Sequence, residues 1–168
     1  MGKLKHTPNP ELARVGLSMQ ELDGLRTRVG WFETNKYPAK QSKSGKAGPV
    51  LPVAYIASIQ EFGYGPIPPR SFFRPTIAKE APNWRALIAQ ASKGVVTGKR
   101  SAFQAMELLG LQAAGDVRAA IAAVSSPPLA AATIRARKAR GNSSTKPLSD
   151  TRIMMQTLTH ITDNGGTK

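Results

Sequence analysis

The 168-residue chain has no cysteine, only two histidines and few aromatic residues. Without cysteine it can form neither a disulfide bond nor a thiolate metal site. The two histidines, His6 and His160, do not stand at metal-ligand spacing with any other candidate ligand. We therefore expect no metal centre and no bound cofactor.

Long apolar runs are also absent. The stretch from Ala119 to Val124 is about the longest, and a membrane-spanning helix needs roughly 20 apolar residues. We expect no membrane partner. A hydrophobic content of 40% nevertheless argues against a wholly disordered chain. The alanines between Ala102 and Ala139 favour closely packed helices.

Acidic side chains are scarce: 10 Asp and Glu residues face 24 Lys and Arg residues, which gives a formal net charge of +14. Such an excess predicts a polyanionic neighbour, either nucleic acid or an acidic protein surface. The alternative is charge spread over the surface for solubility. The basic residues gather near 36–46, 70–85 and 135–146. That distribution suits contacts on several faces better than one DNA-reading helix.

The order of apolar and capping residues predicts an α+β fold, a small, mainly antiparallel sheet packed with several helices, in a single domain over 1–168. Helices are expected from Pro10 to Gly24, from Pro52 to Gly63, from Asn83 to 94 or 98, over 101–124 (the longest), over 130–140, and as a last turn at 153–155. Strands are expected at 28–34 and 157–162.

Three segments are expected to lack regular structure: a flexible basic loop at 35–50, a polar loop at 141–147 and a loose C-terminal tail at 163–168. The basic loop and the basic helix supply candidate contacts to a DNA lumen or a partner ring, namely Lys40, Lys43, Lys46, Arg135, Arg137, Lys138 and Arg140. The four residues of the helix do not fall on one face, and no motif predicts base readout. A solvated basic helix is the alternative.

No catalytic constellation stands out, and we expect no enzymatic activity. The stretch from Gly94 to Arg100 resembles a phosphate-binding loop only superficially. It has three residues between its glycines instead of four, and Arg100 stands where a metal-binding Ser or Thr is needed. We expect a joint between two helices there. The ten carboxylates are scattered along the chain, although two of them can still converge in space as acid and base.

The stretch at 59–75 reads IQEFGYGPIPPRSFFRP. Gly63 stands where a helix C-cap glycine belongs. Because a proline disfavours helical geometry in the residue before it, the four prolines predict an extended crossing of the surface. Phe72 and Phe73 would then point to opposite sides. We expect one of the two rings to pack in the core of its own subunit and the other to reach a neighbouring subunit.

Four pieces, in this order, resemble the tail-completion and head–tail joining proteins of long-tailed double-stranded DNA phages. This family includes minor tail and virion-morphogenesis proteins and is similar in role to lambda minor tail protein Z. The pieces are the strand at 29–32, the helix ending in Glu61-Phe62-Gly63, the segment at 67–75, and Pro127-Pro128-Leu129 with Thr133 followed by KPLSDT at 146–151. The resemblance covers about residues 25 to 163. The chain departs from the family pattern at two positions. Ser71 stands where the family usually has a proline, and Arg152 stands where the family commonly has a glycine. Arginine resists the positive φ that glycine permits.

The resemblance implies a non-enzymatic virion protein of the neck or tail, assembled in the host cytoplasm. It would form a homo-oligomeric ring, with sixfold symmetry as the family-level expectation. The ring would contact the head–tail connector and the tail terminator or tail tube, with phage DNA passing through its lumen. The expected interface residues are Glu61, Arg70, Phe72, Phe73 and Arg74, whose arginines can bind carboxylates bidentately. The alternative is that this segment folds back on its own chain.

Two other functions stay open. One is a tail terminator or connector protein, which is also a small α+β ring former. The other is a basic nucleic-acid-binding module, which predicts tight, salt-sensitive binding by the isolated monomer.

Overall fold

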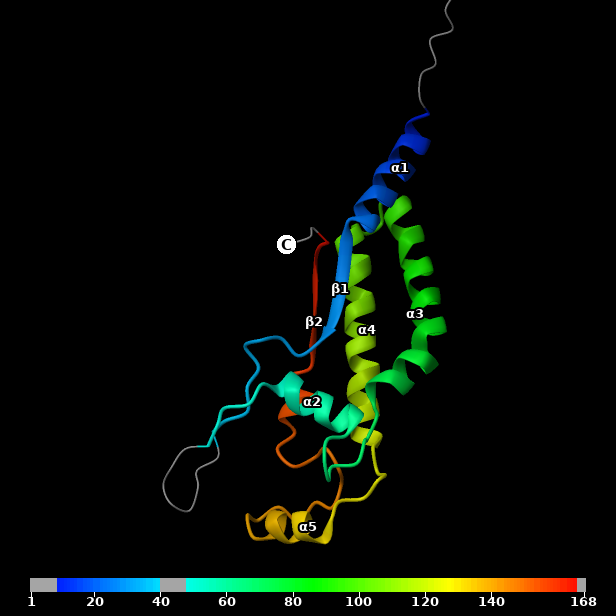
Figure 1. The fold of residues 1–168 in the computed structure, drawn as a ribbon. Coiled ribbons are helices and arrows are strands. Elements are labelled where there is room, and N and C mark those ends of the chain that lie inside the picture. Colours follow the sequence, from blue (N-terminus) through cyan, green and yellow to red (C-terminus); the bar gives the residue numbers. More distant parts are fainter. Residues whose placement is uncertain (1–8, 40–47, 166–168) are drawn as a thin grey trace, which may run out of the picture. The chain divides into compact units, whose positions relative to one another are not determined.

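The computed structural model describes residues 9–39 and 48–165. The elements follow one another as α1 (Pro10–Asp23), β1 (Leu25–Gly30), α2 (Val53–Phe62), α3 (Phe73–Val96), α4 (Ala102–Ala123), α5 (Ala131–Lys138), α6 (Ile153–Gln156) and β2 (Thr159–Asn164) (Figure 1). Within the described residues, six helices accompany one antiparallel sheet made of β1 and β2. The predicted α+β class is confirmed.

The chain divides into two compact units. One comprises 1–28, 82–112 and 160–168, and the other comprises 29–81 and 113–159. We call them the first and the second unit. Because the divisions at 81/82 and 112/113 fall inside α3 and α4, both helices contribute residues to both units. Each unit has its own hydrophobic cluster.

The cluster of the second unit consists of Val53, Ala57, Phe72, Val117, Ile121, Met154 and Leu158, all buried. It is built from α2, α4 and α6 together with the residues that lead into α3 and β2. Trp31 packs against this cluster, and its indole Nε1 donates a hydrogen bond to the Met154 carbonyl at 2.8 Å. Trp31 is partly buried, and an indole N–H removed from water without an acceptor costs free energy.

The cluster of the first unit is made of small side chains. Ala91 and Val95 of α3 meet Ala102 and Ala105 of α4, and Leu22, Leu25 and Ile88 pack around them. Gly110 serves a similar close approach, because a Cβ there would overlap the His160 ring and the Thr27 methyl group.

Most predicted helices are confirmed within a few residues, but the start of α3 is not. The prolines predicted an extended chain through Pro75, with a helix from Asn83. In the structure α3 already begins at Phe73 and includes Pro75 and Pro82. Pro75 lies in the first turn, where a backbone N–H has no intrahelical acceptor and its loss is harmless. Pro82 lies inside the helix and removes one helical hydrogen bond.

The strands are displaced from their predicted positions. β1 spans 25–30 rather than 28–34, and β2 spans 159–164 rather than 157–162. The described part of the C-terminal tail is therefore not loose: 163–164 belong to β2, and Gly165 donates a backbone hydrogen bond to the Gly24 carbonyl at 2.7 Å.

The two predicted loops are partly anchored. At the base of the basic loop, Tyr37 N donates to Leu51 O at 2.8 Å and Val53 N donates to Asn35 O at 2.9 Å. Lys40, Lys43 and Lys46 lie outside the described residues. The polar loop at 141–147 follows α5 and is tied to it by side-chain hydrogen bonds, described with the basic residues below.

Across residues 9–39 and 48–165, none of the helices has the length and hydropathy that crossing a membrane requires.

Candidate functional site

Glu61 is the centre of the segment that the sequence singled out. It lies near the end of α2 and is buried. Its carboxylate accepts hydrogen bonds from the backbone N–H groups of Phe72 at 2.8 Å, Phe73 at 2.9 Å and Arg74 at 3.2 Å. These amides open α3, where N–H groups lack intrahelical partners and the helix dipole favours an anion. Glu61 thus caps α3 from another helix.

Arg74 completes this arrangement. Its Nε donates to the Glu61 carboxylate at 3.0 Å, and its Nη2 donates to the Ser71 hydroxyl at 3.1 Å. The Ser71 hydroxyl in turn donates to the Glu61 backbone carbonyl at 2.9 Å. We call Glu61, Ser71 and Arg74, with the three amides at 72–74, the Glu61 clamp. Ser71 thus links Arg74 to the backbone of Glu61.

The pKa of Glu61 is lowered below its ordinary value. Burial acts to raise this pKa, but the hydrogen bonds from the amides of Phe73 and Phe72 and from Arg74 together outweigh burial. Glu61 is therefore ionised at neutral pH with its acceptor sites engaged by its own chain. A carboxylate held in this way stabilises the fold and is poorly suited to proton transfer.

Arg70 joins this segment to a distant part of the second unit. Its guanidinium is buried and donates to the carbonyls of Pro127 at 2.7 Å and Pro128 at 3.0 Å, and to the Gln60 side chain at 3.3 Å. Burial lowers its pKa, and the nearby charge of Arg137 lowers it further. The sequence analysis expected Arg70 to bind a carboxylate across a subunit boundary; the partners found are carbonyl and amide oxygens of its own chain.

Both phenylalanines pack against the core of their own chain. Phe72 is 2% exposed in the second unit's cluster, and Phe73 packs against the same cluster. Their ring centroids are 6.3 Å apart, and each lies within 6.4 Å of the Trp31 ring. The expectation that only one of them packs into this core is wrong. It assumed an extended backbone, whereas the chain turns into α3 at Phe73.

An exposed edge adjoins the buried side chain of Glu61. Phe62 is 63% and Tyr64 68% exposed, and the Arg74 guanidinium lies 4.6 Å from the centroid of the Phe62 ring. Gly63 makes the turn between the two aromatic residues with a φ of 79°, and a Cβ there would press on Ile67 and Pro69. Sequence reasoning missed Phe62 and Tyr64. The available signal was the alternation of apolar residues around Gly63 at the end of a helix.

The basic helix α5 is partly used within its own chain. Arg137 is buried, and its Nη1 donates to the carbonyls of Ser144 at 3.2 Å and Lys146 at 2.7 Å. Arg140 pairs with Asp150 at 3.1 Å. Arg137 holds the polar loop, which corrects the prediction that it is a contact to a partner; Arg140 is paired but its side chain is 51% exposed, so it stays a candidate. Arg135 and Lys138 are exposed and stay candidates for such contact.

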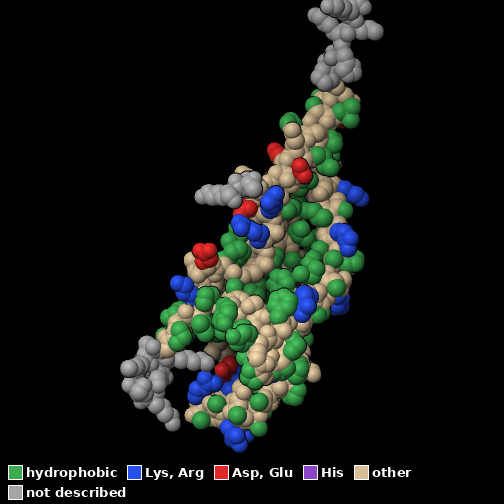
Figure 2. Space-filling model, in the orientation of Figure 1, with side chains coloured by type: hydrophobic (Ala, Val, Ile, Leu, Met, Phe, Trp, Pro, Cys, Tyr) green, Lys and Arg blue, Asp and Glu red, His purple; other side chains and the backbone are tan. Residues whose placement is uncertain are grey.

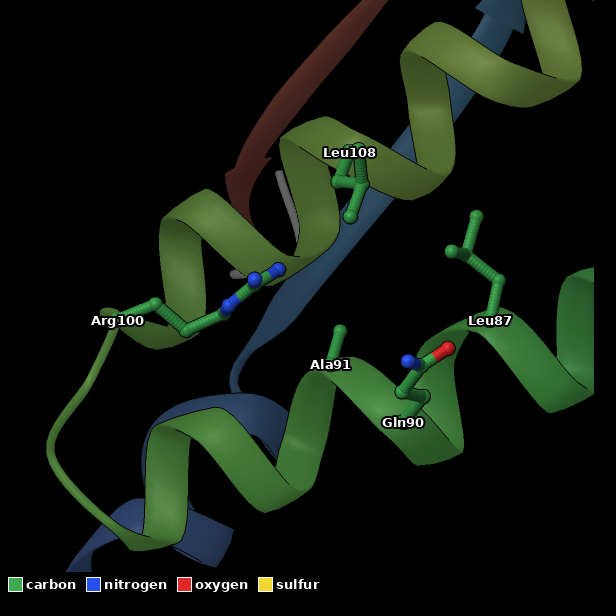
Figure 3. A pocket seen from close by; sticks show the side chains of 5 residues that line it. All are labelled: Leu87, Gln90, Ala91, Arg100 and Leu108. Carbon is green, nitrogen blue, oxygen red and sulfur yellow. The ribbon is translucent and has the colours of Figure 1, made fainter.

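The first unit contains a small hollow between α3 and α4. It has a volume of about 140 Å³ and is lined by Leu87, Gln90, Ala91, Arg100 and Leu108 (Figure 3). Small-molecule sites usually enclose about 300–1,000 Å³. Residues 97–101 connect α3 to α4, so the predicted helix–helix joint is confirmed.

The positions of the His, Asp and Glu side chains show whether they are close enough together to bind a metal ion. In the described part of the chain, no three His, Cys, Asp or Glu residues come together as a metal site. His160 lies on β2 with its Nε2 3.3 Å from the Glu107 carboxylate.

Comparisons with protein-family models, with curated proteins and with solved structures find no match. A functional assignment therefore depends on the residues of this chain itself.

Proposed function

We propose that this chain is a structural protein of a tailed-phage virion. It forms a ring in the neck that completes the tail and joins it to the head-side connector. The proposal has two supports: the resemblance of four sequence segments to the tail-completion family, and the way these segments contact one another within the second unit.

The contacts among the four segments carry the proposal. Trp31, from the first segment, packs edge-on against Phe72, from the third, at 6.0 Å between ring centroids. Glu61, from the second segment, caps the helix that begins in the third. Arg70, from the third, donates to the carbonyls of the fourth segment's Pro127 and Pro128. Residues that contact one another in this way are the ones that a shared fold would need. The resemblance therefore supports a common fold directly, and it supports the proposed function only through that fold.

These contacts change which residues we propose for the interface. Glu61, Ser71, Arg70 and Phe72 have their bonding and packing partners within the chain, so their role is to position the edge beside them. Arg74 belongs to both groups, because it donates to Glu61 while its side chain is 59% exposed. The side chains of Phe62, Tyr64 and Arg74 form that edge. Aromatic and arginine side chains are enriched at protein interfaces. We propose that the edge meets a neighbouring subunit or the adjoining ring.

Complementation in the phage that encodes the protein tests this role. A gene copy carrying Phe62→Ala and Tyr64→Ala, the two exposed aromatic residues of the edge, should give fewer heads joined to tails in electron micrographs than the wild-type copy. Arg152→Ala, which removes an exposed arginine just before α6, is the matched control and should leave joining unchanged. Normal joining with the double variant would remove the edge from the interface. Imaging the position of the ring would separate tail completion from a tail terminator or connector.

A nucleic-acid-binding role has one observation in its favour, the exposed Arg135 and Lys138 in a chain of net charge +14. It predicts that the isolated chain binds duplex DNA tightly and that affinity falls steeply with salt. A ring protein through which DNA merely passes should bind weakly. Titration of labelled DNA at two salt concentrations distinguishes these roles, and tight, salt-sensitive binding would favour the DNA-binding module.

A further inference from the structure

Helix α1 of the first unit carries an apolar stripe that its own chain leaves largely uncovered. Leu12, Val15, Met19 and Leu22 recur at the spacing of one helix face. Leu22 packs against the first unit's cluster, whereas Leu12 is 70% exposed and Met19 is also exposed. Of the described α1 side chains, Ser18 alone is buried. Figure 2 shows hydrophobic side chains exposed along this helix.

The hollow between α3 and α4 is a complementary surface. Leu87 of α3 and Leu108 of α4 point into it, and Arg100 reaches along its side (Figure 3). Leu111, one turn beyond Leu108 on the same helix face, is exposed as well. A volume of about 140 Å³ is close to the roughly 150 Å³ that accommodates a benzene-sized group. The hollow thus fits one large apolar side chain.

The charges of the two surfaces are opposite. Helix α1 contains Glu11, Glu21 and Asp23 against Arg14, so it carries a net charge of −2 in a strongly basic chain. The segment 93–100 beside the hollow contains Lys93, Lys99 and Arg100 and no acidic residue, a net charge of +3. Two α1 helices would repel each other, whereas α1 and the hollow attract.

We infer that α1 of one copy docks on the α3–α4 hollow of a second copy. Leu12 or Met19 fills the hollow, and Asp23, which follows Met19 by four residues on the same face of α1, lies toward the basic residues at 93–100. This is the helix-in-groove mode, in which apolar anchors at i, i+3 and i+7 enter a hydrophobic groove. Because the two surfaces differ, the contact is head to tail, and such contacts generate rings when the rotation closes. The inference rests on the proposed function for the role of the ring in a virion.

Sedimentation velocity of the purified full-length chain tests the α1 side. Wild-type protein should associate as its concentration rises. Leu12→Asp with Met19→Asp should weaken association by about tenfold or more, because interface anchors dominate binding. The matched control is Leu17→Asp, a side chain that is 62% exposed on the opposite side of the same helix, and it should associate as wild type does. Circular dichroism checks that each variant is folded. A wild-type protein that stays monomeric at every accessible concentration would refute the contact.

Mixing two damaged proteins tests the head-to-tail geometry. Leu108→Asp damages the hollow and leaves α1 intact, and the α1 double variant has the converse defect. Each alone should be monomeric, whereas their mixture should form a one-to-one dimer through the one intact α1 and the one intact hollow. Pairing of α1 with α1 would instead let the Leu108→Asp protein associate normally, and that result would overturn the proposed geometry.

The absence of cysteine offers an independent measurement. Copies carrying Leu12→Cys can be mixed with copies carrying Leu108→Cys and treated with a short bis-maleimide linker. The inference predicts a cross-linked heterodimer, and Leu17→Cys in place of Leu12→Cys should give little. Equal cross-linking from both positions would contradict the predicted face of α1.

The two proposals fail separately. If the purified protein associates through α1, but phage particles that lack the protein still join heads to tails, the α1 contact is supported and the virion role is refuted. If joining requires the protein but the α1 variants join heads to tails and associate normally, the virion role stands and the α1 contact falls.

Discussion

At the scale of single residues, the side chain of Glu61 and the backbone of Arg152 each affect the stability of the second unit. Glu61 exchanges solvation for four hydrogen bonds within its own chain, three of them from backbone amides. Arg152 has a φ of 58°, a left-handed conformation that favours glycine. This agrees with the expectation from the sequence that arginine resists a positive φ at this position.

Replacing Glu61 by glutamine should destabilise the protein by about 2–3 kcal/mol at neutral pH, because charge-assisted hydrogen bonds are lost and an amide NH₂ faces backbone donors. Urea denaturation followed by circular dichroism measures this loss. The matched control is Glu33→Gln, an exposed carboxylate in the same unit, which should change stability by less than about 0.5 kcal/mol. Equal effects of both substitutions would contradict the structural role of the clamp.

The pH dependence of the same pair of proteins has a definite sign. The folded pKa of Glu61 lies below its ordinary value, 4.5. Its contribution to stability is therefore fully present above that value and is lost as the pH falls through the lower, folded pKa. The difference in unfolding free energy between wild type and Glu61→Gln should be constant from pH 7 to about 5.5 and shrink in more acidic solution. A difference that grows on acidification would contradict the lowered pKa.

Arg152→Gly should raise the unfolding free energy by about 0.5–1 kcal/mol, since glycine relieves the left-handed strain but adds freedom to the unfolded chain. Arg152→Ala removes the same exposed side chain and keeps the strain, so its stability should stay near that of wild type. Thermal and urea unfolding of the three proteins decide the matter. A stabilisation by alanine as large as that by glycine would show that the side chain, not the backbone, is responsible.

At the scale of elements, local signals predicted the helices whose ends are fixed locally. Pro52 and Gly63 bracket α2, and Ser101 immediately precedes α4, close to the ends that the sequence indicated. The start of α3 was missed because its capping group, Glu61, is 11 residues from the first amide that it binds. The link from Arg70 to Pro127 spans 57 residues. Contacts of this range depend on how the chain packs, which periodicity and propensity do not encode.

The α4 cap offers a test of a local signal. Ser101 Oγ accepts from Gln104 N at 3.1 Å, and the Gln104 side chain accepts from Ser101 N at 3.0 Å, a reciprocal capping box. Ser101→Ala should lower the unfolding free energy by about 1 kcal/mol. As a control, Ser58→Ala alters an exposed serine within α2 and should be nearly neutral. Denaturation curves for both variants check this, and a neutral Ser101→Ala would show that α4 does not need its cap.

At the scale of the whole molecule, the two units carry different parts of the proposal. The second unit holds the four contacting segments on which the proposed function rests, and the exposed edge at Phe62, Tyr64 and Arg74. The first unit holds α1 and the α3–α4 hollow, where we infer contact between copies. The candidate site was only partly predictable: the sequence located the 61–75 segment, but packing moved the proposed contacts from buried Phe72 and Arg70 to exposed Phe62 and Tyr64.

Electron microscopy of phage particles made without this protein tests the central claim most directly. The measured quantity is the fraction of DNA-filled heads that carry a tail, compared with particles made when the wild-type gene is supplied in trans. A neck protein that joins tail to head predicts abundant filled heads and separate, full-length tails, with joining restored by the supplied gene. Intact tailed particles at the normal fraction in its absence would contradict the proposed function.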